Sequence, residues 1–465
     1  MTPPSIVWLR RDLRLADQPA LDAAASEGPV IPVYVLDDET SKHRAPGGAS
    51  RWWLHCSLAA MTTQLHRHHS RLVLRRGKAA EVLAQLAAET GASAIHCLRH
   101  YEPWWRNAER QLAGALPASV ELVRHDGNYL LPPGAVTTGS GSPYKIFTPF
   151  YRALLEQMPP RDPLPAPSLS SPETWPESDA LDDWNLLPAG PDWAGGLREA
   201  WECGEMAAYE QLERFLAHAD RYEAERNLPS LEGSSRLSPH LHFGEISPAH
   251  IWHALKGNRS EGATSFRREL VWRDYAANVL AQFPDYPERP YKEEFARLAW
   301  RDPETDGAAA ADLAAWQQGR TGYPIVDAGM RQLWASGWMH NRVRMIAASF
   351  LVKHLLIDWR HGERWFWDTL VDADYASNGT NWQWVAGSGI DANMFVRIMA
   401  PLSQSEKFDA AGYIRQWVPE LAELDDLYVH DPEAHGRLPE DYPSKIIGHR
   451  EGRERALLAW KMLKD

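Results

Sequence analysis

The chain has 465 residues, which is more than one hydrophobic core usually organises, so we expect about two domains. Its formal net charge is -13, so any nucleic-acid site has to be a local basic patch on an acidic protein. The three cysteines, Cys56, Cys97 and Cys203, form no CxxC pair, which argues against a zinc site, an iron–sulfur cluster or a disulfide framework. No secretory signal and no apolar stretch of membrane-spanning length is visible, so we expect a monomeric cytoplasmic protein without a membrane partner.

The first part of the chain alternates short apolar runs with amphipathic stretches. The apolar runs lie at 6–9, 30–36, 72–74, 94–98 and 120–123, and helical patterns lie between them, as at 52–65 and 79–88. Strand and helix repeated in this way predict an α/β domain over 1–130, a Rossmann-like doubly wound parallel sheet. No GxGxxG follows the first strand, so a dinucleotide site is not indicated there.

A change of composition marks the end of this domain. Residues 159–191 are rich in Pro, Ser, Asp and Trp, which cannot hold a helix or an inner strand, and we assign 131–195 to an interdomain linker. After it, apolar residues recur at helical spacing, which predicts an all-α domain over 196–465. The predicted helices lie at 197–217, 249–255, 264–282, 325–336, 341–356 and 363–370.

Two stretches of the second half carry groups suited to a ligand. Gly233-Ser-Ser-Arg-Leu-Ser238 places hydroxyls and backbone N–H groups ahead of a helical segment, which suits a phosphate, although a Ser-rich helix cap needs no ligand. The stretch from Asp372 to Trp384 leads from a polar cluster into paired indoles. Such a pattern makes a poor core and favours a site for an aromatic ligand.

Four long motifs identify the chain with a known family. Residues 8–14 (WLRRDLR), 321–328 (TGYPIVDA), 338–345 (WMHNRVRM) and 378–384 (NGTNWQW) resemble the photolyase/cryptochrome family in order and spacing, over nearly the whole chain. Within the family the chain is most similar to class I cyclobutane pyrimidine dimer photolyases. The resemblance implies light-driven, redox-neutral repair of these dimers in DNA by excited reduced FAD, without a metal.

The resemblance also implies which residues hold FAD in the helical domain. The residues that match the diphosphate-holding segment are Tyr222, Ser234, Ser235, Arg236, Leu237 and Ser238. Arg344, Asp372 and Asp374 match positions around the isoalloxazine ring. Asn378 matches the position opposite flavin N5, where an amide can hydrogen-bond the reduced flavin without acting as a strong acid.

An electron path to the flavin is implied as well. Trp382, Trp359 and Trp300 match the family's chain of three tryptophans, through which an excited oxidised flavin draws electrons from the protein surface. The segment after Trp300 looks longer than usual, so Trp316 is the alternative outermost donor.

For the lesion and its DNA, the family pattern points to two sets of residues. Glu269, Trp272, Asn341, Met345 and Trp384 match the lesion-facing set, in which the two indoles grip the flipped bases and Glu269 hydrogen-bonds one of them. The positions that match phosphate contacts are Arg226, Arg342, Arg397 and Lys407, and they would supply the local basic patch.

Two related functions and one further cofactor remain open at this point. A cryptochrome photoreceptor would not need the lesion-facing set, and a (6-4) photolyase has histidines where this chain has Asn341 and Met345. A second, antenna chromophore, a folate or a deazaflavin, is left unassigned, because the Asn-Glu pair of folate-binding members is missing from 101–105. Trp104 and Trp105 could stack on such a molecule or pack the domain interface.

Overall fold

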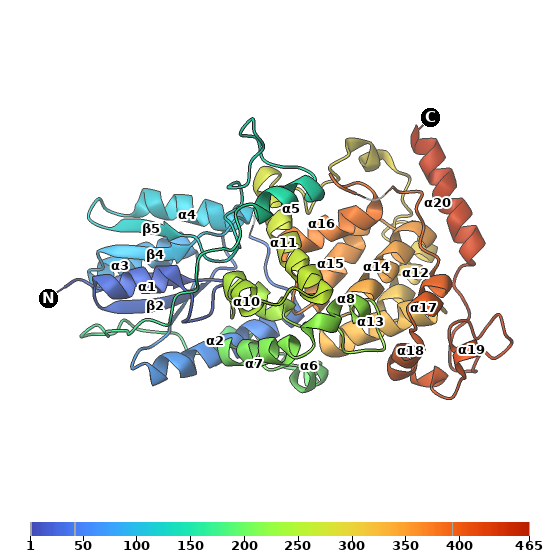
Figure 1. The fold of residues 1–465 in the computed structure, drawn as a ribbon, viewed down its shortest axis with the longest axis horizontal. Helices are drawn as coiled ribbons and strands as arrows, with labels where there is room; N and C mark the ends of the chain where they lie inside the picture. Colours follow the sequence, from blue (N-terminus) through green and yellow to red (C-terminus); the bar gives the residue numbers. More distant parts are fainter. Residues whose placement is uncertain (1, 41–42, 393, 465) are drawn as a thin grey trace.

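The computed structural model of the protein describes residues 2–40, 43–392 and 394–464. It begins with a five-stranded sheet in which every pair of neighbours is parallel and the strand order is β3-β2-β1-β4-β5. The strands are β1 Ser5–Leu9, β2 Val30–Leu36, β3 Val73–Arg76, β4 Ala94–Leu98 and β5 Glu121–His125. The sheet lies at one end of the molecule and the C-terminal helix at the other (Figure 1).

Helices cover the faces of this sheet. They are α1 Pro19–Glu27, α2 Gly48–Arg67, α3 Ala79–Thr90 and α4 Pro103–Ala115. Because both faces are covered, β1, β2 and β4 are buried along their whole length, as continuous apolar runs require. The prediction of a doubly wound parallel α/β fold is confirmed.

The segment between the two halves contains more structure than a linker would. Helix α5, Phe147–Leu155, lies inside the stretch assigned to the linker, and Phe147 and Phe150 are buried in one cluster with residues of the helical half. From 156 to 180 the chain is without helix or strand, in agreement with its Pro-rich composition. The domain boundaries themselves stay a prediction.

The rest of the chain is helical, as predicted. Its helices are α6 Gly195–Ala200, α7 Glu205–Leu216, α8 Tyr222–Glu225, α9 Ser238–His242, α10 Pro248–Ala254, α11 Glu261–Gln282, α12 Gly307–Gln317, α13 Pro324–Ser336, α14 Asn341–Ser349, α15 Trp359–Thr369, α16 Tyr375–Ala386, α17 Pro401–Lys407, α18 Ala411–Trp417, α19 Asp426–Val429 and α20 His449–Lys464. The helix predicted at 197–217 is two helices, because Gly204, with φ +100°, lies against α2. A Cβ atom on Gly204 would be 2.6 Å from the Cβ of Ala60.

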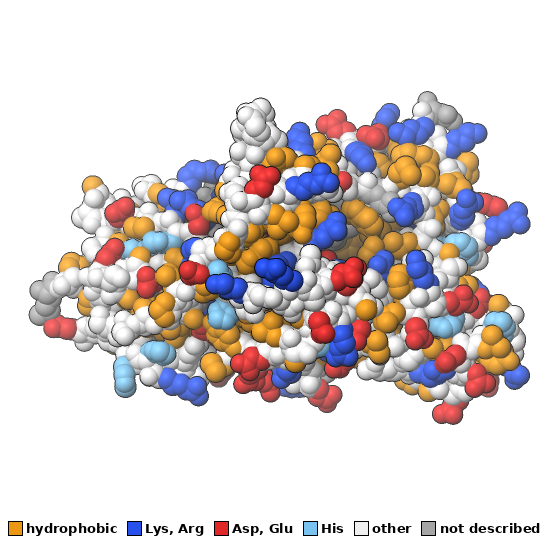
Figure 2. Space-filling view, viewed as in Figure 1, with side chains coloured by type: hydrophobic (Ala, Val, Ile, Leu, Met, Phe, Trp, Pro, Cys, Tyr) orange, Lys and Arg blue, Asp and Glu red, His pale blue; other side chains and the backbone are white. Residues whose placement is uncertain are grey.

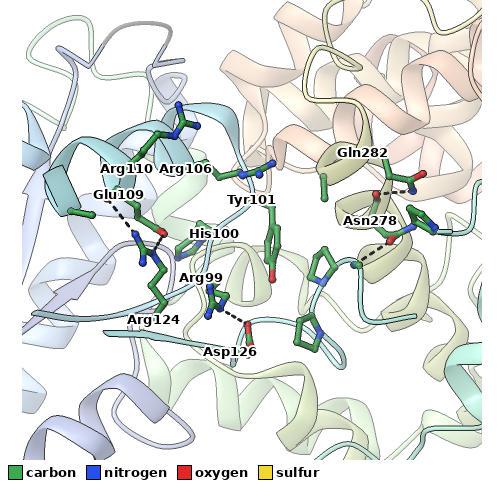
Figure 3. Close-up of a pocket in the computed structure, with 16 residues that line it drawn as sticks. Arg99, His100, Tyr101, Arg106, Glu109, Arg110, Arg124, Asp126, Asn278 and Gln282 are labelled. Carbon is green, nitrogen blue, oxygen red and sulfur yellow. Dashed lines mark hydrogen bonds and ion pairs between the residues drawn. The ribbon is translucent and has the colours of Figure 1, made fainter. Parts of the chain in front are cut away.

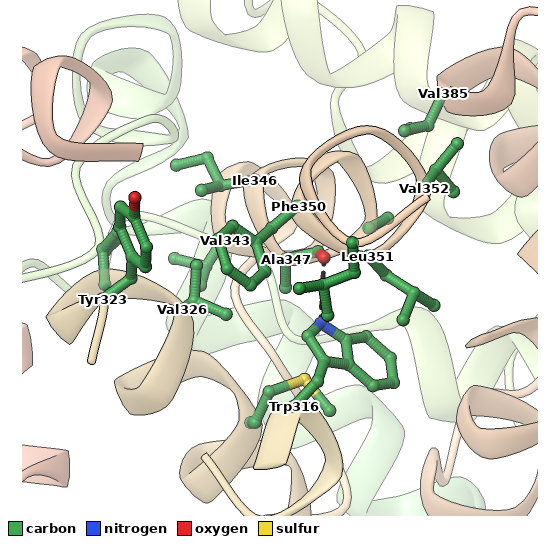
Figure 4. Packing of buried hydrophobic residues seen from close by; sticks show 14 of the residues in the cluster. Trp316, Tyr323, Val326, Val343, Ile346, Ala347, Phe350, Leu351, Val352 and Val385 are labelled. Atoms are coloured by element: carbon green, nitrogen blue, oxygen red, sulfur yellow. Dashed lines mark hydrogen bonds between the residues drawn. The ribbon is translucent and has the colours of Figure 1, made fainter. Parts of the chain in front are cut away.

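The helix predicted at 341–356 also ends early as a regular helix. After α14 the chain continues as a π-helical turn, Phe350–His354, whose five side chains are all buried. Around it lies the main core of the helical half, part of which Figure 4 shows. There the indole N–H of Trp316 donates a hydrogen bond to the backbone oxygen of Ala347 at 3.0 Å. No helix in the described ranges is long and apolar enough to cross a membrane.

The loop after β1 ties the two halves together. Arg14, 0% exposed, donates hydrogen bonds to the backbone oxygens of Gly127 and Gly244 at 3.0 and 2.9 Å. From the other side, the Glu205 carboxylate accepts hydrogen bonds from the backbone N–H groups of Leu15 and Ala16 at 2.8 and 2.9 Å. The N-terminal sequence motif therefore acts as a joint between the sheet and the helical half.

One buried carboxylate on α11 faces the connecting segment. Asp274 is 2% exposed, and one of its oxygens accepts a hydrogen bond from the Leu131 N–H at 3.1 Å. Its other oxygen has no hydrogen-bond partner in the part of the chain that the structure describes. Burial raises the pKa of Asp274 to about 7, against the opposing effect of the Arg273 charge.

We expect the Asp274→Asn variant to be more stable than the parent protein at pH 8 and about equally stable near pH 4. The folded protein keeps this carboxyl protonated up to about pH 7, whereas the unfolded chain ionises it near pH 3.8, so the parent loses stability as the pH rises through this interval. The loss persists above pH 7 and is on the order of a few kcal/mol. Thermal melts of both proteins between pH 4 and 8 measure it, and identical pH profiles would contradict a buried neutral carboxyl.

Candidate flavin and DNA site

The predicted site residues lie on helices that pack on one another. Helix α16 contacts α11, α14 and α15. Figure 2 shows a hollow near the middle of this face, over α11 and α16, with Lys and Arg side chains around it. The sequence separates these helices by up to about a hundred residues, and the fold brings them to one place.

The stretch expected to hold a phosphate is a loop that leads into α9. Gly233 packs closely on Glu225, since a Cβ atom on Gly233 would lie 2.5 Å from the Glu225 Cβ. Arg236 has φ +51°, and its guanidinium lies 4.3 Å from the ring centroid of Trp201. Helix α9 has only five residues, so the loop's own hydroxyl and N–H groups, and not a long helix dipole, would have to hold the anion.

The remaining members of this set also lie at the loop. Ser234 and Ser235 are half-buried, and the backbone oxygen of Ser235 accepts a hydrogen bond from the Gln211 side chain at 2.8 Å. Leu237 is 0% exposed and anchors the loop in the core. Tyr222, at the start of α8, is 7% exposed, and burial raises its pKa.

A bidentate ion pair joins α14 to the start of α16. Arg344 donates to both carboxylate oxygens of Asp372, at 3.2 and 3.0 Å, and to the backbone oxygen of Met339 at 2.7 Å. The Ser238 hydroxyl donates to Asp372 at 2.6 Å. Three predicted residues from separate segments therefore form one polar network.

Asp374 forms a second network with the loop after β1. It caps α16 by accepting the Ser377 N–H at 2.8 Å, and it accepts a hydrogen bond from Arg11 at 3.2 Å. Although burial opposes it, the His242 ring, 3.9 Å from the carboxylate, and the Arg11 charge hold the pKa of Asp374 well below its usual range. Asp374 is therefore ionised at neutral pH.

The orientation of the Asn378 amide is fixed by its neighbours. Its NH₂ group donates to the backbone oxygen and to a carboxylate oxygen of Glu363, at 3.1 and 2.8 Å. Arg44 holds that carboxylate with two hydrogen bonds of 2.7 and 2.8 Å. A carboxylate only accepts hydrogen bonds, so the amide oxygen of Asn378 faces away from Glu363 and can accept one from a ligand. Sequence reasoning missed Arg44 and Glu363.

The tryptophans of the predicted electron path differ in burial. Trp382 and Trp359 are each 2% exposed and belong to the same core cluster. Trp300 is half-buried. The next residue, Arg301, donates its backbone N–H to the backbone oxygen of Leu356 at 2.8 Å, and Leu356 lies three residues before Trp359. Trp316 is 0% exposed, and its ring centroid lies 6.3 Å from that of Trp382. Of the two alternatives, only Trp300 has the solvent exposure that an outermost donor needs.

The lesion-facing residues of α11 have partners on other helices. Trp272 stacks on Phe147 of α5 with ring centroids 3.4 Å apart and an interplanar angle of 4°, so one face of its indole is covered. Glu269 forms an ion pair of 2.5 Å with Arg226, whose guanidinium also lies over the Tyr222 ring. Arg226 was predicted to contact a phosphate; the ion pair with Glu269 adds a partner, and the phosphate contact stays a prediction.

The other predicted lesion and phosphate positions lie on α14, α16 and after α16. Asn341 is exposed, and Met345 and Trp384 are half-buried. Arg342 donates to Asn227 at 2.6 Å, and its guanidinium lies over the Phe408 ring at 4.5 Å.

Two further basic side chains of the predicted phosphate set are exposed. Arg397 and Lys407 are exposed, with no side-chain ion pair within the described residues.

His340 precedes α14, but burial and the Arg342 charge lower its pKa to about 4, and its ring nitrogen accepts the Arg342 N–H. It is therefore a neutral helix cap.

The two indoles considered for an antenna are buried. Trp104 and Trp105 are 5% and 7% exposed, His43 stacks on Trp104 at 5.5 Å, and Tyr375 contacts Trp104 at 4.8 Å. This arrangement favours packing of the domain interface. In the described ranges, no group of His, Cys, Asp and Glu side chains is arranged to hold a metal ion.

Comparison with known proteins identifies the family. A family model described as the FAD binding domain of DNA photolyase matches residues 266–462, and one described as DNA photolyase matches residues 5–168. A deoxyribodipyrimidine photo-lyase from Agrobacterium fabrum is 47% identical over 482 residues, which cover 100% of this chain and 98% of that protein. The chain belongs to the DNA photolyase family.

Solved structures agree with this assignment. A class III photolyase from Agrobacterium tumefaciens matches 100% of the chain and 98% of its own, with a TM-score of 0.93 and 46% identity. A photolyase from Sulfolobus tokodaii with two FAD molecules has a TM-score of 0.83 and 29% identity over 99% of this chain and 100% of its own. A Synechocystis cryptochrome has a TM-score of 0.86 and 28% identity over 98% and 99%.

The chain is therefore an enzyme of this family, and FAD is the cofactor of its helical half. The residues present fit this cofactor. The loop at 233–238 has hydroxyl and N–H groups that suit the diphosphate of FAD. The Arg344–Asp372 pair suits the polar edge of the flavin ring, and the Asn378 amide oxygen can accept a hydrogen bond from the ring. The resemblance to class I is not confirmed, because the solved relative at 46% identity is a class III photolyase.

Proposed function

We propose that the protein uses blue or near-UV light to split cyclobutane pyrimidine dimers in DNA, acting as a monomer. The observation that carries this proposal is the lesion-facing set on mutually packed helices. Glu269 and Trp272 lie one turn apart on α11, Asn341 and Met345 one turn apart on α14, and Trp384 on α16. The chemistry supplied by bound reduced FAD is one electron, donated on illumination and returned after the two carbon–carbon bonds have broken.

The chain's own residues would position the dimer. Phe147 covers one face of Trp272 and fixes the plane of the indole, so its other face is offered to an extruded base. Arg226 holds Glu269 by an ion pair at 2.5 Å, which orients the carboxylate as a hydrogen-bond acceptor for the base. In this proposal Arg226 positions Glu269 and also contacts a phosphate of the DNA, as the sequence predicts.

A second set of residues would hold the cofactor ready for electron donation. The Arg44–Glu363–Asn378 chain of hydrogen bonds presents an amide oxygen, which is the acceptor that the N–H of a reduced flavin needs. The Arg344–Asp372 pair and Ser238 would fix the polar edge of the ring. These assignments of single residues are part of the proposal.

The basic side chains beside this set suit the DNA backbone. Arg342 and Lys407 both lie over the Phe408 ring, and Arg397 and Lys407 are exposed. Such a cluster can neutralise phosphates although the whole chain carries a net charge of -13. The absence of histidine at 341 and 345, together with the neutral buried His340, favours a cyclobutane dimer over a (6-4) lesion as substrate.

A repair assay tests the proposal. The reduced, FAD-loaded protein is illuminated with an oligonucleotide that carries one thymine dimer, and recovery of thymine absorbance is measured beside a (6-4) oligonucleotide. We expect recovery with the first substrate only. Recovery with the (6-4) lesion alone would indicate the alternative photolyase, and recovery with neither would favour a photoreceptor.

We expect the Trp272→Ala variant to bind dimer-containing DNA more weakly in the dark. Loss of one base–aromatic stack removes about 1–3 kcal/mol, which corresponds to a roughly 5- to 150-fold weaker affinity. Fluorescence anisotropy with damaged and undamaged duplexes measures the change. The control is Trp334→Ala, since Trp334 is 58% exposed on α13, outside the proposed site. A loss of the same size for undamaged DNA would refute a lesion-specific role for Trp272.

A further inference from the structure

Two of the three thiols lie together where α2 meets the helical half. Cys56 is on α2, and Cys203 lies in the short segment between α6 and α7; both are half-buried. Figure 1 shows α2 running beside α6 and α7. One turn before Cys56, the Trp53 ring contacts the Trp201 ring at 5.3 Å, which sets the register of the two segments.

The same register continues on the other side of the two thiols. One turn after Cys56, Ala60 lies against Gly204, where an added Cβ atom would be 2.6 Å from the Ala60 Cβ. One turn further, the Gln64 amide donates to Glu205 at 2.6 Å. Contacts before and after the two cysteines therefore hold the segment that contains Cys203 against one face of α2.

The two thiols are not equivalent. The neighbouring Cys203 thiol is the main cause that lowers the pKa of Cys56. Burial raises the pKa of Cys203, so Cys203 keeps its proton. Cys97 differs from both, because it is 0% exposed in β4 and burial raises its pKa to about 12. Cys56, whose pKa is lowered, can therefore act as the nucleophile, and the neighbouring Cys203 can then react with the oxidised Cys56.

We propose that Cys56 and Cys203 form a reversible disulfide that covalently joins the α/β half to the helical half when the protein meets a peroxide. This modification site is separate from the flavin and lesion residues and does not depend on the proposed function. The cysteines lie 147 positions apart in the chain, so sequence spacing alone could not pair them.

The reaction needs one molecule of hydrogen peroxide. The Cys56 thiolate attacks a peroxide oxygen, so an S–O bond forms, the O–O bond breaks, and the leaving hydroxide takes up the proton that Cys56 released. The Cys203 sulfur then attacks the Cys56 sulfur, the S–S bond forms, and the S–O oxygen leaves as water with the Cys203 proton. Two thiols lose two electrons and two protons, and the peroxide becomes two waters.

The link would fasten a segment that also supports the cofactor loop. Trp201, two residues before Cys203, packs under the Arg236 guanidinium at 4.3 Å. Oxidation would fix this segment to α2, whereas reduction would leave it held by packing alone.

The test treats the folded, FAD-loaded protein with stepwise additions of hydrogen peroxide, followed by denaturation and alkylation with N-ethylmaleimide. We expect the number of alkylated cysteines to fall from three to one, with Cys97 the one left, and the peptides that contain Cys56 and Cys203 to be linked. Dithiothreitol should restore all three. In the matched control Cys97→Ser, the count should fall from two to none.

The Cys203→Ser variant separates the two steps. We expect its Cys56 to stop at sulfenic acid, which dimedone labels, whereas Cys56 of the parent protein is not labelled. Three alkylated cysteines after peroxide, a link that includes Cys97, or oxidised Cys56 and Cys203 without a linked peptide would each overturn the proposal. The peptide map of the parent protein gives this answer even if a variant fails to fold.

Discussion

The Arg344→Ala variant is expected to purify with almost no flavin. Arg344 is the cation of a bidentate pair with Asp372, whose side chain is 5% exposed and also accepts the Ser238 hydroxyl. Removing the guanidinium leaves a buried carboxylate without its counter-charge beside the proposed ring edge. Breaking such a pair costs about 3–5 kcal/mol, which would weaken flavin binding by about two to four orders of magnitude. The ratio of flavin to protein absorbance of the purified protein measures the loss.

Two further variants show whether this loss is specific. Arg397→Ala removes an exposed arginine of the proposed DNA patch and should keep the flavin. The double variant Arg344→Ala/Asp372→Asn removes the uncompensated charge and should recover part of the thermal stability, but not the flavin. Normal flavin content in Arg344→Ala would show that the pair is only structural.

The fold could be predicted from the sequence because its signals are local. Apolar runs three to seven residues long, separated by amphipathic stretches, predicted each strand of the sheet to within two residues at either end. The errors lie where distant segments meet. The break at 201–204 comes from the contact of Gly204 with α2, and neither the periodicity nor the composition of 197–217 reveals it.

The site was predicted from family motifs more than from physical patterns, and the structure shows what those motifs leave out. Arg44 and Glu363 are 319 positions apart, and Arg11 and Asp374 are 363 positions apart, so no local pattern links them. Each pair joins the α/β half to the start or flank of α16. The α/β half therefore takes part in the site, because it supplies the arginines that set the carboxylates and the amide in place.

The cationic residues illustrate the same limit. Sequence reasoning placed Arg226 with the phosphate contacts, and the structure adds a carboxylate partner that the sequence does not show. Its neighbour Glu269 lies 43 positions away, on another helix. Only the fold shows which of the predicted arginines also have a carboxylate partner.

The Trp382→Phe variant is expected to lose photoreduction of oxidised flavin by orders of magnitude while repair by chemically reduced enzyme stays close to that of the parent. Trp382 is buried on α16, where Gly362 of α15 leaves room for its ring, since a Cβ atom there would lie 2.1 Å from the indole. A phenyl ring fills most of this space but is much harder to oxidise than an indole. The excited oxidised flavin therefore cannot take an electron from this position, and the chain of short electron-transfer steps is broken. Time-resolved flavin absorbance after a blue flash measures the first process, and dimer repair after dithionite reduction measures the second.

Two companion variants locate the outer end of the path. Trp300→Phe should also slow photoreduction, because Trp300 is half-buried and can be re-reduced from solution. Trp316→Phe should not slow photoreduction, although the ring centroid of Trp316 lies 6.3 Å from that of Trp382. An indole that is 0% exposed cannot be re-reduced by a reductant in solution, so an electron taken from Trp316 must return to it. A larger effect of Trp316→Phe than of Trp300→Phe would reverse this assignment. Equal loss of photoreduction and repair in Trp382→Phe would show that the residue holds the flavin and does not relay electrons.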